Sequence, residues 1–308
     1  METFLIYLIF PGFIFTAALG MMARWLDRKV TARLQWRVGP PWYQSFADIV
    51  KLLGKQTIVP PECRKPAFLL APVLGLAGMI AVSGMLGAVS LNPARGFAGD
   101  LIAVICILAV PSLALFIGGR ASGNPLAEIG ASREMKLMAA YGIPFILAAF
   151  TPAAKAGLTV ALGDILACQH VRGALLWSPS GILAFIVGLV CMQARLGFVP
   201  FDSPEAETEI EAGPLTEYSG TLLAIFTLMK MMLVVIVPWF LLILFAGGVQ
   251  FQGWGIARSM LRYLLMLIIA ILVKNTNPRI RIDQALRFFR GPVTVAAAAG
   301  VVLALLGY

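Results

Sequence analysis

Residues 220 to 246 read GTLLAIFTLMKMMLVVIVPWFLLILFA and hold a single charged side chain, Lys230. A run of about 20 predominantly apolar residues is long enough to cross the hydrocarbon core of a bilayer as a helix. A helix that is apolar on all sides belongs in a membrane or in the core of a large protein. The run therefore predicts a transmembrane helix, and it sets the fold class of the chain.

The rest of the 308-residue chain repeats this pattern. Hydrophobic residues make up 60% and charged residues 13% of the chain, whereas soluble domains contain about 45–50% apolar and about 25% charged residues. Only short polar loops separate the apolar runs, so little chain remains for a soluble catalytic domain. We expect an all-α, polytopic membrane helical bundle of about eight transmembrane helices, in a single membrane domain over residues 1–308. The predicted spans are 3–23, 67–90, 101–119, 137–157, 180–194, 220–246, 259–274 and 292–307.

The distribution of basic residues predicts the orientation, because Lys and Arg close to the spans are retained in the cytoplasm. The loops after the first, third, fifth and seventh spans carry 18 of the 24 basic residues. We therefore expect these loops in the cytoplasm and both termini outside, in a multi-pass protein of the cell inner membrane. The net charge of +9 then reflects topology, so we expect lipid contacts and no nucleic-acid partner.

The first of these loops contains an amphipathic segment, residues 42–55. Such a segment is typical of a helix that lies along the membrane interface. The simpler alternative is a peripheral anchor with no further role. The apolar residues recur at helical spacing, at Trp42, Phe46, Ile49, Val50 and Leu53.

The loop after the fifth span is acidic. This acidic loop, residues 201–219, holds six of the fifteen acidic residues of the chain. Pro204 suits a first helical position and Gly213-Pro214 ends a helix, so we expect a short helix of about three turns. Glu205 and Glu209 then share one face, where each carboxylate disfavours ionisation of the other.

Crowded carboxylates at the edge of a membrane are suited to proton transfer, because repulsion and partial burial raise the pKa of some of them. Lys230 lies within the sixth span, where an ionisable residue faces the bundle interior or a hydrated cavity. Two alternatives remain: a loop that only binds a basic surface of a partner, and a Lys230 that reaches back to the interface. The predicted proton-transfer residues are Asp202, Glu205, Glu207, Glu209, Glu217 and Lys230.

Further charged residues flank the spans on the same predicted side. Arg133 and Glu134 open the fourth span, and Arg279, Arg281 and Asp283 follow the seventh. They either hold the acidic loop by ion pairs or only enforce topology. The predicted supporting residues are Asp27, Asp48, Lys51, Arg133, Glu134, Arg279, Arg281 and Asp283.

The residue types that bind redox cofactors are sparse. The four cysteines form no CxxC pair, and His170 is the single histidine. Iron–sulfur clusters need several thiolates at short spacing and membrane haem generally needs histidines. We therefore expect no catalytic residue and no metal in this chain, and we expect the electron carriers on partner chains.

Five segments, in this order, resemble the subunit of respiratory complex I that forms the quinone chamber. Energy-converting NiFe hydrogenases and formate hydrogenlyase share that subunit in variant form. The segments are Leu26-Asp27-Arg28-Lys29; Arg37-Val38-Gly39-Pro40 with Ala47 to Leu52; Pro200-Phe201-Asp202 through Glu207; Glu217-Tyr218-Ser219-Gly220; and Arg279 to Gln284.

The variant residues favour the hydrogenase branch of this family. Gly130 to Glu134 and Glu211 to Tyr218 look like the hydrogenase versions of the motifs. Gly142 and Lys230 stand about where relatives from complex I carry glutamates in the fourth and sixth spans. The resemblance also implies that the acidic loop faces iron–sulfur and NiFe subunits.

The resemblance thus implies a membrane anchor and proton-coupling subunit of an energy-converting (group 4) NiFe hydrogenase. The expected partners are the hydrogenase large and small subunits, a ferredoxin-like iron–sulfur subunit and antiporter-like membrane subunits, with the iron–sulfur clusters and the NiFe centre on those partners. One alternative is the quinone-site subunit of a complex I-type NADH:quinone oxidoreductase. Another is a stand-alone cation transporter, which the lack of a convincing inverted repeat disfavours.

Overall fold

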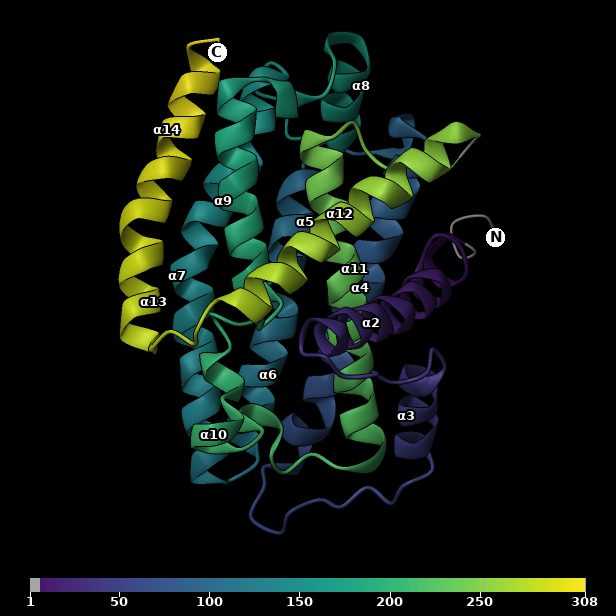
Figure 1. Ribbon diagram of the computed structural model, residues 1–308, viewed down its shortest axis with the longest axis vertical. Coiled ribbons are helices and arrows are strands. Elements are labelled where there is room, and N and C mark those ends of the chain that lie inside the picture. The colour runs from purple at the N-terminus through teal and green to yellow at the C-terminus, as the bar shows by residue number, and fades with distance from the viewer. Residues whose placement is uncertain (1–5, 252, 308) are drawn as a thin grey trace.

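The computed structural model describes residues 6–251 and 253–307, without the side chains of Glu207 and Thr208. Every element in this part of the chain is helical, and most of the long helices form one bundle (Figure 1). Seven helical stretches are long and apolar enough to cross a membrane. The chain is therefore a multi-pass helical membrane protein, as its composition predicts. The spanning helices are α2 (Phe13–Leu34), α4 (Lys65–Leu91), α5 (Asp100–Leu108) continued by α6 (Val110–Ala121), α7 (Pro125–Lys155), α11 (Gly220–Phe245), α12 (Trp254–Thr276), and α13 (Ile282–Phe288) continued by α14 (Thr294–Leu305).

The fifth predicted span, residues 180–194, is the short helix α9 (Pro179–Arg195), which has 17 residues and is shorter than the seven others. At 1.5 Å per residue it extends about 26 Å, slightly less than the hydrocarbon thickness of about 30 Å. It packs against α7 and α14. A further helix, α8 (Leu162–Arg172), lies in the loop before it and was not expected from hydropathy.

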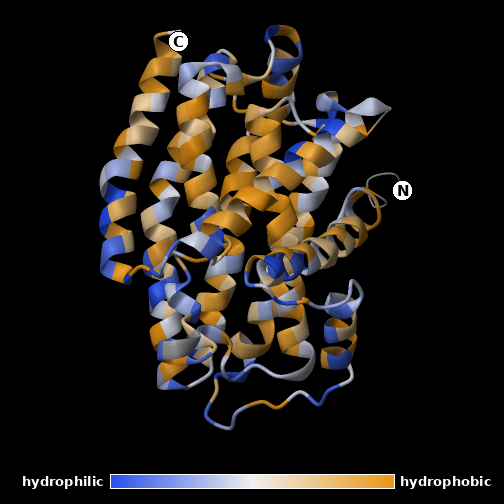
Figure 2. Ribbon diagram, in the orientation of Figure 1, coloured by the Kyte–Doolittle hydropathy of each residue, from blue (hydrophilic) through white to orange (hydrophobic). Residues whose placement is uncertain are grey.

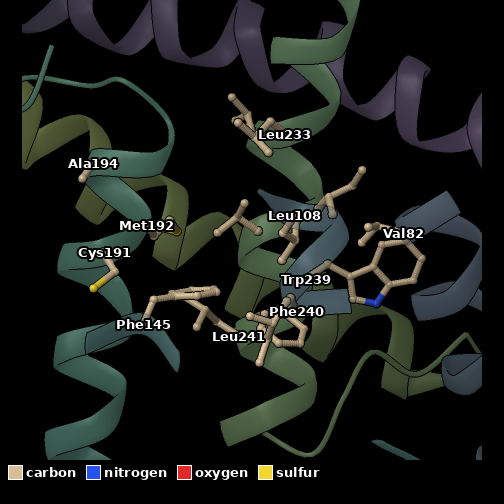
Figure 3. Packing of buried hydrophobic residues seen from close by; sticks show 14 of the residues in the cluster. Val82, Leu108, Phe145, Cys191, Met192, Ala194, Leu233, Trp239, Phe240 and Leu241 are labelled. Atoms are coloured by element: carbon tan, nitrogen blue, oxygen red, sulfur yellow. The ribbon is translucent and has the colours of Figure 1, made fainter. Parts of the chain in front are cut away.

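The run that decides the fold forms the centre of the bundle. In α11, 89% of the most apolar stretch is buried, against 28–56% in the other spans. Its side chains Leu233, Trp239 and Phe240 lie among residues of the neighbouring helices (Figure 3). Lipid is as apolar as these side chains, so close packing stabilises such a core more than escape from water does.

The helix α2 crosses α11 in backbone contact at Gly20. A Cβ atom built on Gly20 would lie 2.5 Å from the carbonyl oxygen of Met231. Small residues at such crossings let two membrane helices approach closely. This contact lies beside Lys230, so it helps to fix the position of that charge.

The polar segments gather at the two ends of the bundle. The helix α3 (Gln44–Leu53) and the short helix α10 (Glu207–Ile210) lie at one end, and α8 and the C-terminus lie at the other (Figure 1). Hydrophobic residues fill the middle, whereas hydrophilic residues cluster towards the end with α3 and α10 (Figure 2). We call this the inner end, because its basic residues predict that it faces the cytoplasm. The positions of both termini outside stay a prediction.

Residues 44–53 of the predicted amphipathic segment form the helix α3, and Trp42 lies just before it. Trp42, Phe46 and Val50 are exposed, which suits a helix at the membrane interface. Ile49 is instead buried, because α3 packs against α2 and α11. Ile49 thus packs against the bundle, whereas Trp42, Phe46 and Val50 remain free to contact the membrane interface.

The prediction of a three-turn helix in the acidic loop was wrong. The loop forms a 3-10 turn at Ser203–Glu205, the four-residue α10, and a second 3-10 turn at Gly213–Leu215. Glu205 and Glu209 do not share a helical face, because Glu205 ends the first 3-10 turn and Glu209 lies in α10. Each is bound by a different basic residue. The backbone turns out of the helix at Glu211, where φ is 55°.

Replacing Gly20 with alanine is expected to destabilise the chain by about 1–3 kcal/mol, because the added methyl group overlaps backbone atoms of α11. Gly142→Ala is the matched control, since a Cβ atom there meets nothing within 4 Å. The control should be neutral or slightly stabilising. Thermal unfolding of both purified variants in detergent measures the difference, and equal midpoints would contradict the close crossing.

Candidate functional site

Lys230, ten residues after the start of α11, pairs with Glu205 of the acidic loop. The two side chains form a direct ion pair and are 30% and 36% exposed. A lysine in an apolar span is costly unless an opposite charge or water meets it. Glu205 comes from the 3-10 turn of the acidic loop, so the pair fastens that loop to the central helix.

A second ion pair fastens the acidic loop to α7. Arg133 Nη1 lies 2.6 Å from Glu209 Oε2 and also donates to the carbonyl oxygen of Ser203 at 3.2 Å. Arg133 therefore holds the loop at two points. Gly130, one turn earlier, leaves room for the loop, because a Cβ there would lie within 3 Å of Pro214 and Pro204 atoms.

A third ion pair joins the acidic loop to the segment between α12 and α13. Arg279 Nε lies 2.7 Å from Asp202 Oδ2. Burial raises the pKa of Asp202 above its ordinary value, and the charge of Arg279 partly opposes this rise. Asp202 therefore binds a proton more readily than a solvated aspartate does.

These charged groups surround one pocket of about 310 Å³. Its walls bring together segments that are far apart in the sequence: the start of α7, the acidic loop and the segment before α13. The predicted residues that line it are Arg133, Asp202, Glu209, Arg279, Arg281 and Asp283.

Further polar side chains lie deeper in the bundle, beyond the Glu205–Lys230 ion pair. Glu134 on α7 lies near Ser112 and close enough to Glu205, Lys230 and Arg195 to interact with their charges. Ser112 Oγ lies 3.3 Å from the hydroxyl oxygen of Tyr141.

The last of these groups is Arg195 on α9, which is 7% exposed. Its guanidinium lies 5.2 Å from the centre of the Tyr141 ring, and Nη1 donates to the carbonyl oxygen of Leu108 at 2.6 Å. Sequence reasoning missed Ser112, Tyr141 and Arg195. Arg195 ends an apolar span and was counted only towards topology.

Glu217 does not join this cluster directly. Its Oε1 accepts a hydrogen bond from Asn124 Nδ2 at 2.6 Å, whereas Lys230 is bound by Glu205. The side chain of Glu207 lies outside those that the structure describes.

The supporting residues of the first loop divide into three cases. Asp27 is 1% exposed and lies 2.9 Å from Lys274 Nζ, so it ties α2 to α12. Asp48 pairs with Arg28 at 2.9 Å and ties α3 to α2. Lys51 is exposed and forms no ion pair within the described part of the chain.

Arg281 and Asp283 complete the set of supporting residues. They form a long, exposed pair of 3.9 Å at the rim of the pocket. Exposed pairs of this kind contribute little stability.

Tyr218 lies near the end of the acidic loop and supplies a hydrogen bond that α4 lacks. Pro72 has no N–H, so the carbonyl oxygen of Phe68 lacks its usual helical donor. The hydroxyl of Tyr218 donates to that oxygen at 3.0 Å, and its ring stacks on Phe68 with centroids 4.1 Å apart. Burial raises the pKa of Tyr218, so its hydroxyl stays protonated as a donor.

The site thus defines a class of protein: a membrane helical bundle with carboxylates clamped by basic residues at one end. No three His, Cys, Asp or Glu residues of the described chain stand close enough together to hold a metal ion. The family model described as NADH dehydrogenase matches residues 6–305. The chain belongs to this family.

Its relatives include subunits of respiratory enzymes. A subunit of the NADH-quinone oxidoreductase of Dehalococcoides mccartyi (strain CBDB1) is 34% identical over 301 residues, which cover 92% of this chain and 81% of the relative. The corresponding protein from Geobacillus kaustophilus (strain HTA426) is 31% identical over 274 residues, covering 85% and 81%.

A solved structure is also similar over nearly the whole chain. It is a chain of the membrane-bound sulfane sulfur reductase (MBS), an archaeal respiratory membrane complex, with a TM-score of 0.87 and 28% sequence identity. The match covers 99% of this chain and 100% of that one. The family and the fold agree with the resemblance drawn from the motifs.

Tyr218→Phe is expected to destabilise the chain by about 1–3 kcal/mol, because it leaves the buried carbonyl of Phe68 without a donor. Tyr43→Phe removes a hydroxyl from an exposed tyrosine and should change little. Thermal unfolding in detergent compares the two variants. If both behave like the unsubstituted chain, the hydroxyl does not replace the missing helical bond.

Proposed function

We propose that the chain is the membrane anchor and proton-coupling subunit of an energy-converting NiFe hydrogenase complex. The observation that carries this proposal is the Glu205–Lys230 ion pair with Glu134 behind it, at the inner end of the bundle. The pair joins a surface loop to a buried helix, so a change of charge outside the membrane acts on a charge inside it.

The mechanism follows from the electrostatics of this pair. Two unit charges in a protein interact more strongly than in water, because the effective dielectric constant is lower. An added electron on a partner that docks against the acidic loop favours protonation of Asp202 or Glu205. Once Glu205 is neutral, Lys230 loses its partner and is drawn towards Glu134. The positive charge of Lys230 then favours loss of a proton from Glu134, and this proton moves into the bundle along Ser112 and Tyr141.

The acidic loop is suited to contact with partners. Its clamps, Arg133–Glu209 and Arg279–Asp202, leave the pocket open between them. In the proposed complex this end of the chain faces the subunits that carry the iron–sulfur clusters and the NiFe centre. Antiporter-like subunits pack elsewhere on the bundle, and the chain itself does not cleave or make hydrogen.

The hydrogenase assignment rests on the variant motifs. Gly130 to Glu134 and Glu211 to Tyr218 look like the hydrogenase versions, and Lys230 stands where relatives from complex I carry a glutamate. A chain of the sulfane sulfur reductase is similar over nearly the full length of this chain, and that respiratory complex is named for neither NADH nor quinone. This similarity supports placing the chain in a branch of the family outside complex I. In this proposal, Lys230 is the charge inside the bundle that responds when its partner Glu205 binds a proton.

The second candidate is the quinone-site subunit of a complex I-type NADH:quinone oxidoreductase. The names of the relatives favour it, because each is named as a subunit of an NADH-quinone oxidoreductase. A stand-alone cation transporter is disfavoured for the same reason. Reduction of a membrane quinone by the purified assembly, without hydrogen formation, would select the second candidate.

Neutralising either member of the ion pair is expected to uncouple hydrogen chemistry from proton movement. In the assembled complex in liposomes, Glu205→Gln and Lys230→Gln should abolish most of the proton movement that accompanies each hydrogen formed. Hydrogen formation from reduced methyl viologen and the change in internal pH are measured together.

Lys55→Gln is the matched control, because it also removes one basic charge from the inner end but lies exposed after α3. It should leave coupling unchanged. Subunit composition of each purified complex separates lost coupling from lost assembly. Unchanged coupling in both variants of the ion pair would remove the proposed mechanism.

A further inference from the structure

A second pocket lies at the end of the bundle away from the acidic loop. It lies between α8, the C-terminal end of α11 and the start of α12, and has a volume of about 150 Å³. Figure 1 shows α8 and the beginning of α12 far from α10. The basic residues that line it are His170, Arg258 and Arg262.

The walls of this basic pocket are built by buried hydrogen bonds. Gln169, 4% exposed, donates to the carbonyl oxygens of Ile243 and Leu244 at 2.9 and 3.0 Å. Its side-chain oxygen accepts from the Gly247 amide at 2.8 Å. The chain after α11 is thus tied to α8, so the pocket is preformed.

The two arginines meet no carboxylate within the described part of the chain. Arg262 donates to the carbonyl oxygen of Ala246 at 2.5 Å, whereas Arg258 is exposed and forms no hydrogen bond or ion pair there. The two guanidinium groups are close enough to repel each other. Basic residues are also disfavoured on the side of a membrane protein that this end is predicted to face, so a bound anion would offset both effects.

An apolar stripe begins at Arg258 and follows α12. The side chains that lie three, seven, ten and fourteen positions after Arg258 are on the same face of the helix as Arg258. The stripe is about 21 Å long, which exceeds half of the hydrocarbon thickness, about 15 Å. Its residues are exposed: Leu261, Leu265, Ile268 and Leu272.

An aromatic residue indicates the depth of the pocket in the membrane. Trp254, the first residue of α12, is 88% exposed. Tryptophan is enriched at the level of the lipid headgroups. The pocket therefore lies at headgroup level, with the stripe below it in the acyl region.

We propose that the basic pocket binds the phosphate of an anionic phospholipid whose acyl chains lie along the apolar stripe of α12. Guanidinium groups donate pairs of hydrogen bonds to phosphate oxygens. Free phosphate would use the same donors but would leave the stripe without a role. The site is independent of the proposed proton coupling, because it lies at the other end of the bundle.

The test measures lipid binding to the full-length protein after delipidation in detergent. Native mass spectrometry counts bound phosphatidylglycerol and phosphatidylcholine over a concentration series. The unsubstituted chain should prefer phosphatidylglycerol. Arg258→Gln should weaken that binding by about fivefold, the effect expected of one basic residue near an anionic lipid surface. Arg258→Lys should restore part of it.

The matched control is Arg172→Gln, which removes an exposed basic charge on the same side but outside the pocket. It should leave phosphatidylglycerol binding unchanged. Arg258 makes no contact that folding requires, and thermal unfolding checks this. Three results would overturn the proposal: equal weakening by Arg172→Gln, no preference for the anionic lipid, or displacement of the lipid by millimolar inorganic phosphate.

Discussion

The structure depends on how one charge inside the membrane is neutralised. Lys230 is the single charged side chain of α11, the most buried span of the bundle. Its partner, Glu205, comes from a loop outside the span, because no acidic residue lies within α11 itself. The cost of leaving this lysine unpaired therefore draws the acidic loop against the bundle.

Once Glu205 is fixed, the rest of the inner end follows from charge pairing. Arg133 on α7 holds Glu209, and Arg279 beyond α12 holds Asp202, so the loop connects three spans. Ionisable groups that are partly shielded from water and paired with other charges are sensitive to a new charge nearby. This is why the same groups that stabilise the loop are proposed to couple redox chemistry to protons.

The sequence predicts local features better than distant pairings. Apolar runs determine the spans, and the helical spacing of α3 is visible in its residues. The broken helix of the acidic loop was not predictable from local rules, because its cause lies elsewhere: Glu205 binds a residue 25 positions away and Glu209 one 76 positions away. Lys274 and Asp27 lie 247 positions apart, and only the fold brings them together.

A double-mutant cycle on Glu205 and Lys230 tests the central claim most directly. The unfolding free energies of Glu205→Gln, Lys230→Gln and the double variant are compared with that of the unsubstituted chain in detergent. The account predicts that the double variant is less destabilised than the two single changes together, with an interaction energy of about 0.5–3 kcal/mol. Additive effects of the two changes would mean that the loop is not held by Lys230.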